Sequence, residues 1–278
     1  MFSLDNLVEA DRRPAPYEPG AEMWNDVYIS KMMLEAHLSE DTDAASYMPS
    51  KIRAICDFLP QRMGLTEGSK IIDLGCGPGL YCDLLAKKGF GMTGLDASQN
   101  SIRYAKAHCG DQKTCYVCQS YLTPLGEGAY DAALMISEDY GVLSPENRRL
   151  LLQNIHTALK PRGYFAFDVS SLAAFEGRKE SAAPKWYAVD GAGFWRGHSH
   201  FVLEKTFFYP EIPALCDLYA VLDDEVKVTR VWQTFFSGGS IAAELEEAGF
   251  EVESLYSNLW GGEYRDDAPT VGVICKKS

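Results

Sequence analysis

The sequence predicts an α/β fold in which a seven-stranded, mostly parallel sheet carries helices on both faces. Short apolar segments alternate with helical patterns from residue 70 onward, which is typical of parallel βαβ units. Glycines cluster directly after the first apolar segment, where a strand passes into a helix. An aromatic-rich stretch without helical periodicity breaks the alternation and predicts an antiparallel β insertion after strand five.

The segment before the sheet predicts an arm followed by an N-terminal helical cap. Residues 11–21 contain three prolines and a glycine, so we expect an extended arm. Apolar residues recur at helical spacing over about 22–38 and 48–63, which predicts two amphipathic helices.

The core elements are expected in alternating order. The expected strands are Lys70–Leu74, Gly91–Asp96, Thr114–Gln119, Asp131–Ile136 and Tyr164–Val169. The expected helices are Leu80–Lys88, Ser98–His108 with Ser98 as its N-cap, and Pro145–Leu159. A helix at Gly239–Ala248 and strands at Glu251–Tyr256 and Thr270–Lys276 bring the sheet to seven strands.

The insertion is expected to be a meander of strands at Phe201–Tyr209, Ala214–Leu222 and Val226–Phe236. The chain then divides into four parts: an arm and cap (1–66), a ligand-binding α/β core (67–183), the insertion (184–236) and the completion of the core (237–278). The insertion would roof a substrate or contact a second copy, so we expect a monomer or a homodimer.

Composition narrows the class of partner. The 278 residues include 26 Lys and Arg against 39 Asp and Glu, a net charge of −13, and 46% are hydrophobic. A disordered chain is excluded, and nucleic acid or an anionic membrane is disfavoured because both attract clustered basic residues. The first eleven residues lack the basic and apolar regions of a signal peptide, and the apolar runs are shorter than the ~20 residues that span a bilayer. We expect a soluble, cytoplasmic protein.

The eight cysteines do not predict a disulfide framework or a metal site. Cys115 and Cys118 form a CxxC, but within an expected strand. Side chains three apart on a strand point to opposite faces, so the two thiols cannot clasp one metal ion. We interpret them as structural thiols, with no metal bound.

The stretch Ile71–Gly79 carries the chemistry. It is a buried strand with an acid, Asp73, followed by glycines at alternate positions that lead into a helix. Gly75 and Gly77 allow positive φ and close approach of the backbone to a ligand. Asp73 lies at the carboxyl end of its strand, where ligands bind in open α/β sheets.

The glycine spacing differs from the dinucleotide fingerprint G-x-G-x-x-G. An acid two residues before the first glycine would repel a pyrophosphate but attract an ammonium group. Asp96, at the end of the second strand, can accept both hydroxyls of a ribose. Together these residues predict a nucleoside ligand that carries an ammonium and no phosphate, and they disfavour a nicotinamide dehydrogenase.

On these residues the sequence resembles the class I S-adenosylmethionine (SAM)-dependent methyltransferases, and within them a bacterial small-molecule methyltransferase-like subfamily. The resemblance covers about residues 47–170 and, more weakly, 238–276. It rests on Asp73–Gly79, Gly94–Ser98, Tyr130–Ile136, Leu159–Gly163, Glu247–Phe250 and the Trp-x-x-x-Tyr-Ile-Ser segment Trp24–Ser30. It implies a Rossmann-like fold and methyl transfer from SAM, with S-adenosyl-L-homocysteine (SAH) as product.

The resemblance also implies which residues hold SAM. The glycine loop would lie under the methionine portion, with Asp73 near its amino group, Asp96 on the ribose and Ala97 beside the adenine. Gln119-Ser120 departs from the family, which often has an Asp here for the adenine amino group, and Ser120 or a backbone carbonyl would take its place. The implied cofactor-binding set is Asp73, Gly75, Cys76, Gly77, Gly79, Asp96, Ala97, Ser120, Tyr121, Leu122, Ile136 and Ser137.

Catalytic candidates follow strand four and lie in the insertion. Glu138 and Asp139 could bind a cationic or hydroxylated acceptor, with Tyr140 lining the pocket, or one acid could cap the next helix while the other faces solvent. His198 and His200 are candidate general bases near neutral pH, although ordinary structural histidines fit the same positions.

Trp24 and Tyr28 lie in an expected N-terminal helix behind the arm. They are candidate substrate or lid residues that would exclude water from the reaction, or they pack the helix on the sheet.

The favoured function is a SAM-dependent methyltransferase that transfers a methyl group to N, O or S of a small molecule by in-line displacement. One alternative is a catalytically silent SAM-binding partner or regulatory module. Another is an aminopropyltransferase that uses decarboxylated SAM. This reading is disfavoured because the sequence has no paired-acid motif suited to a polyamine, and because Asp73 is placed for an intact amino-acid end.

Overall fold

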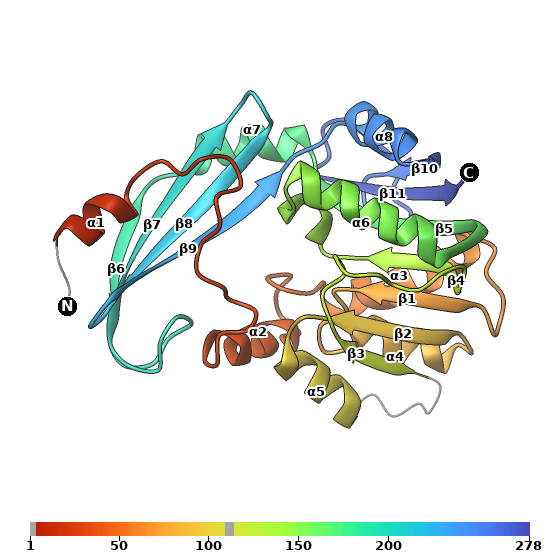
Figure 1. Ribbon diagram of the computed structural model, residues 1–278, viewed down its shortest axis with the longest axis horizontal. Coiled ribbons are helices and arrows are strands. Elements are labelled where there is room, and N and C mark those ends of the chain that lie inside the picture. Colours follow the sequence, from red (N-terminus) through yellow and green to blue (C-terminus); the bar gives the residue numbers. More distant parts are fainter. Residues whose placement is uncertain (1–3, 109–113) are drawn as a thin grey trace.

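The computed structural model describes residues 4–108 and 114–278 and contains the expected seven-stranded sheet (Figure 1). The strand order is β10-β11-β5-β4-β1-β2-β3. The five strands from β3 to β5 pair in parallel, and β11 runs antiparallel to both of its neighbours. The strands are β1 (Lys70–Leu74), β2 (Gly91–Asp96), β3 (Cys115–Cys118), β4 (Tyr130–Met135), β5 (Leu159–Ser170), β10 (Phe250–Tyr256) and β11 (Thr270–Lys277). The predicted fold class is confirmed.

Helices cover both faces of this sheet and enclose two hydrophobic cores. Ile72, Leu74 and their neighbours pack against α6 and α8, whereas Ile71 and the alternate strand positions pack against α3, α4 and α5. This division follows from the two-residue repeat of a strand, which sends successive side chains to opposite faces. The helices are α1 (Leu4–Ala10), α2 (Ile29–His37), α3 (Pro49–Arg62), α4 (Leu80–Lys87), α5 (Gln99–His108), α6 (Pro145–Ala158), α7 (Leu172–Ser181) and α8 (Gly238–Glu247), with a short 3₁₀ helix at Asp139–Val142. Ser98 caps α5 as predicted, its hydroxyl accepting the Ser101 N–H.

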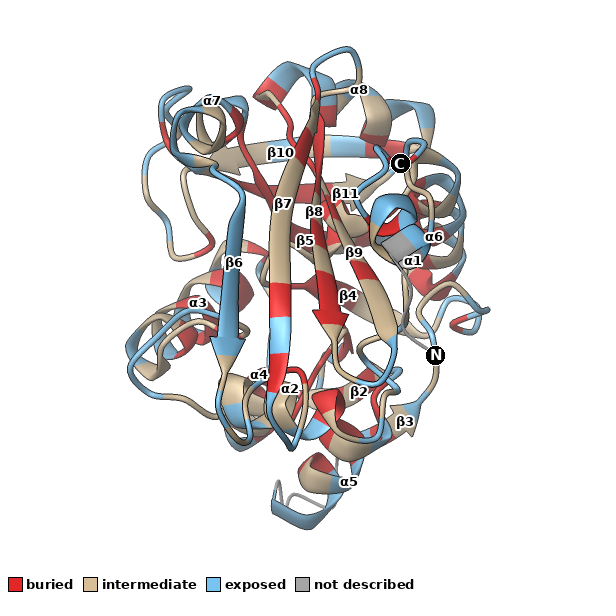
Figure 2. Cartoon of the chain, turned by 90° about the vertical axis from the view of Figure 1, so that its left-hand side faces the viewer, coloured by how far each residue is buried: buried red, intermediate tan, exposed pale blue. Residues whose placement is uncertain are grey.

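The insertion forms a separate antiparallel sheet of order β6-β7-β8-β9. Its strands are β6 (Lys185–Val189), β7 (His200–Tyr209), β8 (Ala214–Leu222) and β9 (Val226–Thr234). Figure 2 shows β6 as an exposed edge strand. The sequence analysis missed β6 and α7. An edge strand that is exposed on both faces lacks the apolar alternation by which strands are recognised, and α7 buries only Phe175.

The helix expected at 22–38 begins only at Ile29, so the prediction that Trp24 lies in a helix is wrong. The cause is Asp26, whose carboxylate accepts the backbone N–H groups of Tyr28 and Ile29 and thereby starts the helix there. Lys227 of β9 forms an ion pair with the same carboxylate. The helix start is therefore fixed from the insertion sheet, which local periodicity cannot reveal.

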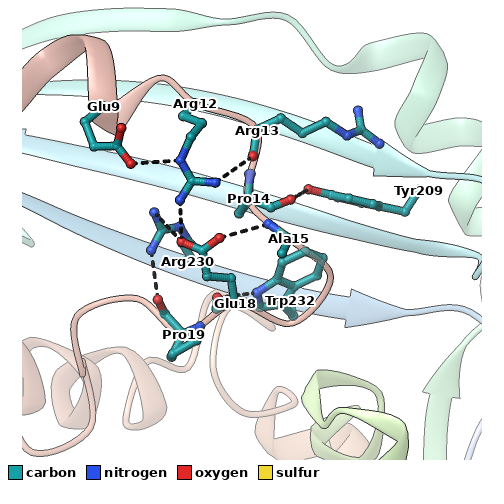
Figure 3. Close-up of polar contacts among 10 residues, drawn as sticks. All are labelled: Glu9, Arg12, Arg13, Pro14, Ala15, Glu18, Pro19, Tyr209, Arg230 and Trp232. Atoms are coloured by element: carbon teal, nitrogen blue, oxygen red, sulfur yellow. Dashed lines mark hydrogen bonds and ion pairs between the residues drawn. The ribbon is translucent and has the colours of Figure 1, made fainter.

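The arm is bound along the insertion sheet rather than free (Figure 3). The Glu18 carboxylate accepts the Arg12 guanidinium and the Ala15 N–H and lies 3.3 Å from the guanidinium of Arg230, while its backbone carbonyl accepts the indole N–H of Trp232. These contacts, the Ala15 N–H first, lower the pKa of Glu18. The arm thus covers one face of the insertion.

Among residues 4–108 and 114–278, no helix is long and apolar enough to cross a membrane. The seven cysteines in these ranges are free thiols, with Cys115 and Cys118 both exposed; Cys109 lies outside them.

Glu18→Ala should release the arm. The substitution removes a carboxylate that three groups share, so the arm should open locally more often. Tryptic cleavage after Arg12 should accelerate accordingly, as measured by mass spectrometry of timed digests. Glu9→Ala is the matched control, because Glu9 contacts only the exposed side of Arg12. Equal cleavage rates in the two variants would show that Glu18 does not anchor the arm.

Candidate functional site

A cavity of about 440 Å³ opens at the carboxyl ends of β1, β2 and β4. Its volume lies in the range of about 300–1,000 Å³ that holds small molecules and cofactors in proteins. Most residues expected to bind the cofactor line it: Asp73, Gly75, Cys76, Gly77, Asp96, Ala97, Ser120, Tyr121, Leu122, Ile136 and Ser137. Gly79 does not; it precedes α4 in the left-handed region.

The glycine loop forms the floor of the cavity. Gly75 has a φ of +75°, and a Cβ there would collide with the carboxylate of Asp139. The N–H groups of Gly75 and Cys76 both donate to the carbonyl of Leu95 in β2, which holds the loop close to the end of that strand. Only glycine combines this conformation with this clearance.

Asp96 holds two loops at the rim. Its carboxylate accepts the Gly77 N–H at 2.9 Å and the Ser98 N–H at 2.6 Å. Burial raises the pKa of Asp96, and the two N–H donors partly offset that rise. The residue therefore shapes the glycine loop and also presents its carboxylate to the cavity.

Asp73 is buried at the end of β1, with 2% of its surface exposed. The thiol of Cys82 donates to it at 3.4 Å. Burial first, and then the charge of Asp96, raises the pKa of Asp73 to about 7. No described residue forms an ion pair with this side chain, but it lines the cavity, where a ligand can supply a cationic partner.

A strained turn follows β4. Ser137 and Glu138 have φ values of +79° and +65°, which non-glycine residues rarely adopt. Both N–H groups donate to one oxygen of Asp168, at 2.9 and 3.1 Å, and the hydroxyl of Tyr47 donates to the other at 2.6 Å. Burial raises the pKa of Asp168. The sequence analysis missed Asp168, although an acid within the apolar strand Tyr164–Val169 was a usable signal.

The turn separates the three candidates that follow it. Asp139 lines the cavity, whereas the Glu138 carboxylate is directed to the hydroxyl of Ser170. Tyr140 is completely buried in the core and its hydroxyl donates to Glu244 at 2.6 Å, so the expectation that it lines the pocket is corrected. Consecutive residues on a helical turn point in different directions, and here the middle one, Asp139, faces the cavity.

The structure places His198 and His200 away from the cavity, at the start of β7. His198 is exposed beside Asp223, and His200 is buried with Nδ1 at 2.7 Å from the carbonyl of His198. Neither residue lines the cavity, which corrects the expectation that they serve as bases there. Their position in an insertion could not be inferred from spacing.

Trp24 and Tyr28 are also separated. Trp24 lines the mouth of the cavity with 44% of its surface exposed. The Tyr28 hydroxyl instead donates to the carbonyl of Gly193 at 2.8 Å and ties the start of α2 to the insertion.

Further wall residues were not predicted from the sequence. The cap supplies Met23, Met33, His37, Ala44, Ala45 and Ser46, the α/β core supplies Leu80, Tyr81, Val142 and Leu143, and the insertion supplies Val231. His37 is the only basic side chain among the described lining residues. Burial lowers the pKa of His37 to about 4, so it is neutral at pH 7. The lining therefore holds three carboxylates and neither Lys nor Arg.

Comparison with known proteins agrees with this geometry. Residues 71–163 match the sequence profile of the family described as "methyltransferase domain". This segment is therefore similar to a methyltransferase domain. An uncharacterized methyltransferase of Synechocystis, sll0829, is 31% identical over 106 residues, which are 38% of this chain and 49% of that protein. The matches cover 44–49% of the length of the first curated relatives, so this chain aligns with about half of each.

Two solved structures share the fold of the methyltransferase domain and its additions. The CcbJ methyltransferase from Streptomyces caelestis superposes with a TM-score of 0.68 at 15% identity, covering 90% of this chain and 98% of its own. A SAM-dependent methyltransferase from Clostridium acetobutylicum gives 0.65 at 15% identity, covering 91% and 100%. The expected resemblance to class I methyltransferases is confirmed in domain family and fold.

Glu138→Gln should flatten the pH dependence of stability. Burial, and then the charge of Asp168, raises the pKa of Glu138 from 4.5 to about 7. The folded state binds this proton more tightly than the unfolded state, so stability falls as pH rises from about 4.5 to about 7, by at most roughly 3 kcal/mol. Urea unfolding at pH 5 and pH 8 measures the fall.

The fall in unfolding free energy between pH 5 and pH 8 should be smaller in Glu138→Gln. It should be unchanged in the control variant Asp131→Asn, because Asp131 lies at the opposite end of β4 and its pKa is lowered. Identical slopes in wild type and Glu138→Gln would contradict the assignment.

Proposed function

We propose that this protein is a SAM-dependent methyltransferase that acts on a small-molecule acceptor. The observation that carries the proposal is the cavity of the methyltransferase domain, where a glycine loop and the carboxylates of Asp73, Asp96 and Asp139 meet and no Lys or Arg is present. SAM carries an ammonium and a sulfonium but no phosphate, so its charges complement this lining.

The residues present fit SAM. Asp73 is buried without a cationic partner and would receive the ammonium group. Asp96 would accept the ribose hydroxyls while it keeps Gly77 in place. Ala97, Tyr121 and Leu122 form an apolar wall for the adenine, with Ser120 beside them. The clearance at Gly75 allows the backbone to approach the methionine portion.

The bound sulfonium would supply an electrophilic methyl group. The protein would hold the acceptor in position and exclude water from the site. Transfer to a lone pair releases a neutral thioether, so no oxyanion hole is required. Catalysis then depends on holding the acceptor in line and excluding water. Trp24, at the mouth, is our candidate for the residue that closes over the ligand, and Tyr28 anchors the segment that carries it.

We propose a small acceptor because the cavity is walled by the cap and by Val231 of the insertion. The net charge of −13 disfavours an RNA or DNA acceptor. A soluble, cytoplasmic protein that is a monomer or homodimer is part of the same proposal.

Calorimetric titration with SAM and SAH tests the first step. We expect binding of both to the wild type, and Asp96→Asn should weaken both by about tenfold or more, because a ribose acceptor and a loop contact are lost together. Asp131→Asn, which lies at the other end of the sheet, should bind normally. No binding by the wild type below about millimolar concentration would remove the cofactor assignment.

Incubation with methyl-labelled SAM and a metabolite extract separates an enzyme from a silent module. We expect label in at least one small molecule, identified by mass. Tight SAM binding without transfer to any component would favour a SAM-binding partner. Incubation with decarboxylated SAM tests the aminopropyltransferase alternative, because aminopropyl transfer leaves the methyl group on sulfur and would release methylthioadenosine.

A further inference from the structure

We infer that the acceptor atom is an uncharged amine nitrogen and that Asp139 is the residue that favours it. The inference rests on the proposed function and names the acceptor class for the same cavity.

Asp139 lies at the centre of the site. It is part of the strained turn after β4, and its carboxylate occupies the space that a Cβ on Gly75 would need on the floor of the cavity, with the Tyr121 ring also nearby. The side chain is half-buried and its accessible surface faces the cavity. Its charged neighbours are Asp96, Asp168 and Asp73, from three different strands.

The other buried carboxylates already have partners or assigned ligands. Asp168 accepts three protein donors, and Asp73 and Asp96 are assigned to the ammonium and ribose of SAM. Among the described residues, none donates a hydrogen bond to the Asp139 carboxylate or forms an ion pair with it. A half-buried carboxylate beside three other acids is destabilising when ionised, and the described lining offers no Lys or Arg, so a cationic ligand is the group that would offset its charge.

The charge changes in methyl transfer distinguish the acceptor classes. An ammonium acceptor first releases its proton to solvent. The nitrogen lone pair then forms the C–N bond while the C–S bonding pair stays on sulfur, giving a methylated ammonium and a neutral thioether. One positive charge therefore passes from sulfur to nitrogen beside Asp139 and keeps its attraction throughout the step.

An oxygen or sulfur anion behaves in the opposite way. The carboxylates of Asp73, Asp96 and Asp139 would repel it on entry, and its methylation would remove the positive charge that Asp139 stabilises. The lining contains no cationic side chain to offset this repulsion. The cavity thus favours a neutral nucleophile whose product is a cation.

Ligand binding tests the position of Asp139 without an acceptor. SAM carries a sulfonium and sinefungin an amine at the transfer centre, whereas SAH is neutral there. We expect the wild type to prefer SAM and sinefungin over SAH by about tenfold. Asp139→Asn should lose that preference and keep its affinity for SAH, while Asp131→Asn keeps both. An unchanged preference in Asp139→Asn would overturn the assignment.

The pH dependence of the preference for SAM over SAH is a second test, because a purely structural role of Asp139 would leave this dependence unchanged. Burial raises the pKa of Asp139, so the SAM-to-SAH preference of the wild type should rise with pH as Asp139 ionises, and that of Asp139→Asn should stay flat. Asp73 and Asp96 also titrate, but they face groups that SAM and SAH share, so their effect cancels in the ratio. A wild-type ratio independent of pH would count against Asp139.

Product analysis tests whether the methyl group is transferred to nitrogen. After reaction with labelled SAM and a metabolite extract, the labelled product should be retained on a cation exchanger at pH 7 and carry the methyl group on nitrogen. Label only on oxygen or sulfur would overturn the inference while leaving the proposed methyltransferase intact. Failure of the wild type to bind SAH, or binding without any transfer, would instead overturn the proposed function.

Discussion

The site depends on one buried carboxylate, that of Asp168. It is 1% exposed at the end of β5, and it accepts the N–H groups of Ser137 and Glu138 together with the hydroxyl of Tyr47. Without this acceptor, the positive φ of Ser137 and Glu138 would cost roughly 1–3 kcal/mol each with no hydrogen bond to offset it. The same carboxylate binds the cap through Tyr47, so the orientation of the residues after β4 and the position of the cap are fixed together.

A cavity that gathers acids and excludes basic side chains carries a cost in stability. Burial raises the pKa of Asp73 and Glu138 to about 7 and raises that of Asp139 well above its usual range, because ionised carboxylates lose hydration and repel one another. A cationic ligand relieves this cost on binding, and the gain appears as affinity. The clustered acids therefore lower the stability of the ligand-free protein, and the same acids favour the binding of a positively charged ligand.

The sequence could predict the parts of the site that lie at strand ends. Asp73 and Asp96 each terminate an apolar run, and parallel strands bring their carboxyl ends to one edge. The contribution of Val231 could not be predicted, because it depends on how a separate sheet packs on the core. The helix start at Ile29 was missed because Lys227, almost 200 residues away, pairs with the capping Asp26. The sequence could not show that Asp139 faces the cavity while Tyr140 is buried. This difference depends on the direction of the turn after β4, which Asp168 holds in place.

The insertion also determines where the mouth of the cavity lies. The Ala21 N–H donates to the carbonyl of Val228 in β9, so the arm leaves the sheet three residues before Trp24. Val231, on the same strand, lines the cavity that Trp24 borders. A shift of β9 by one residue would turn Val231 to the opposite face of its sheet, and it would displace the point from which the arm departs. The register of the insertion therefore positions both walls of the mouth, so a sheet outside the α/β core helps to determine which molecules can enter the cavity.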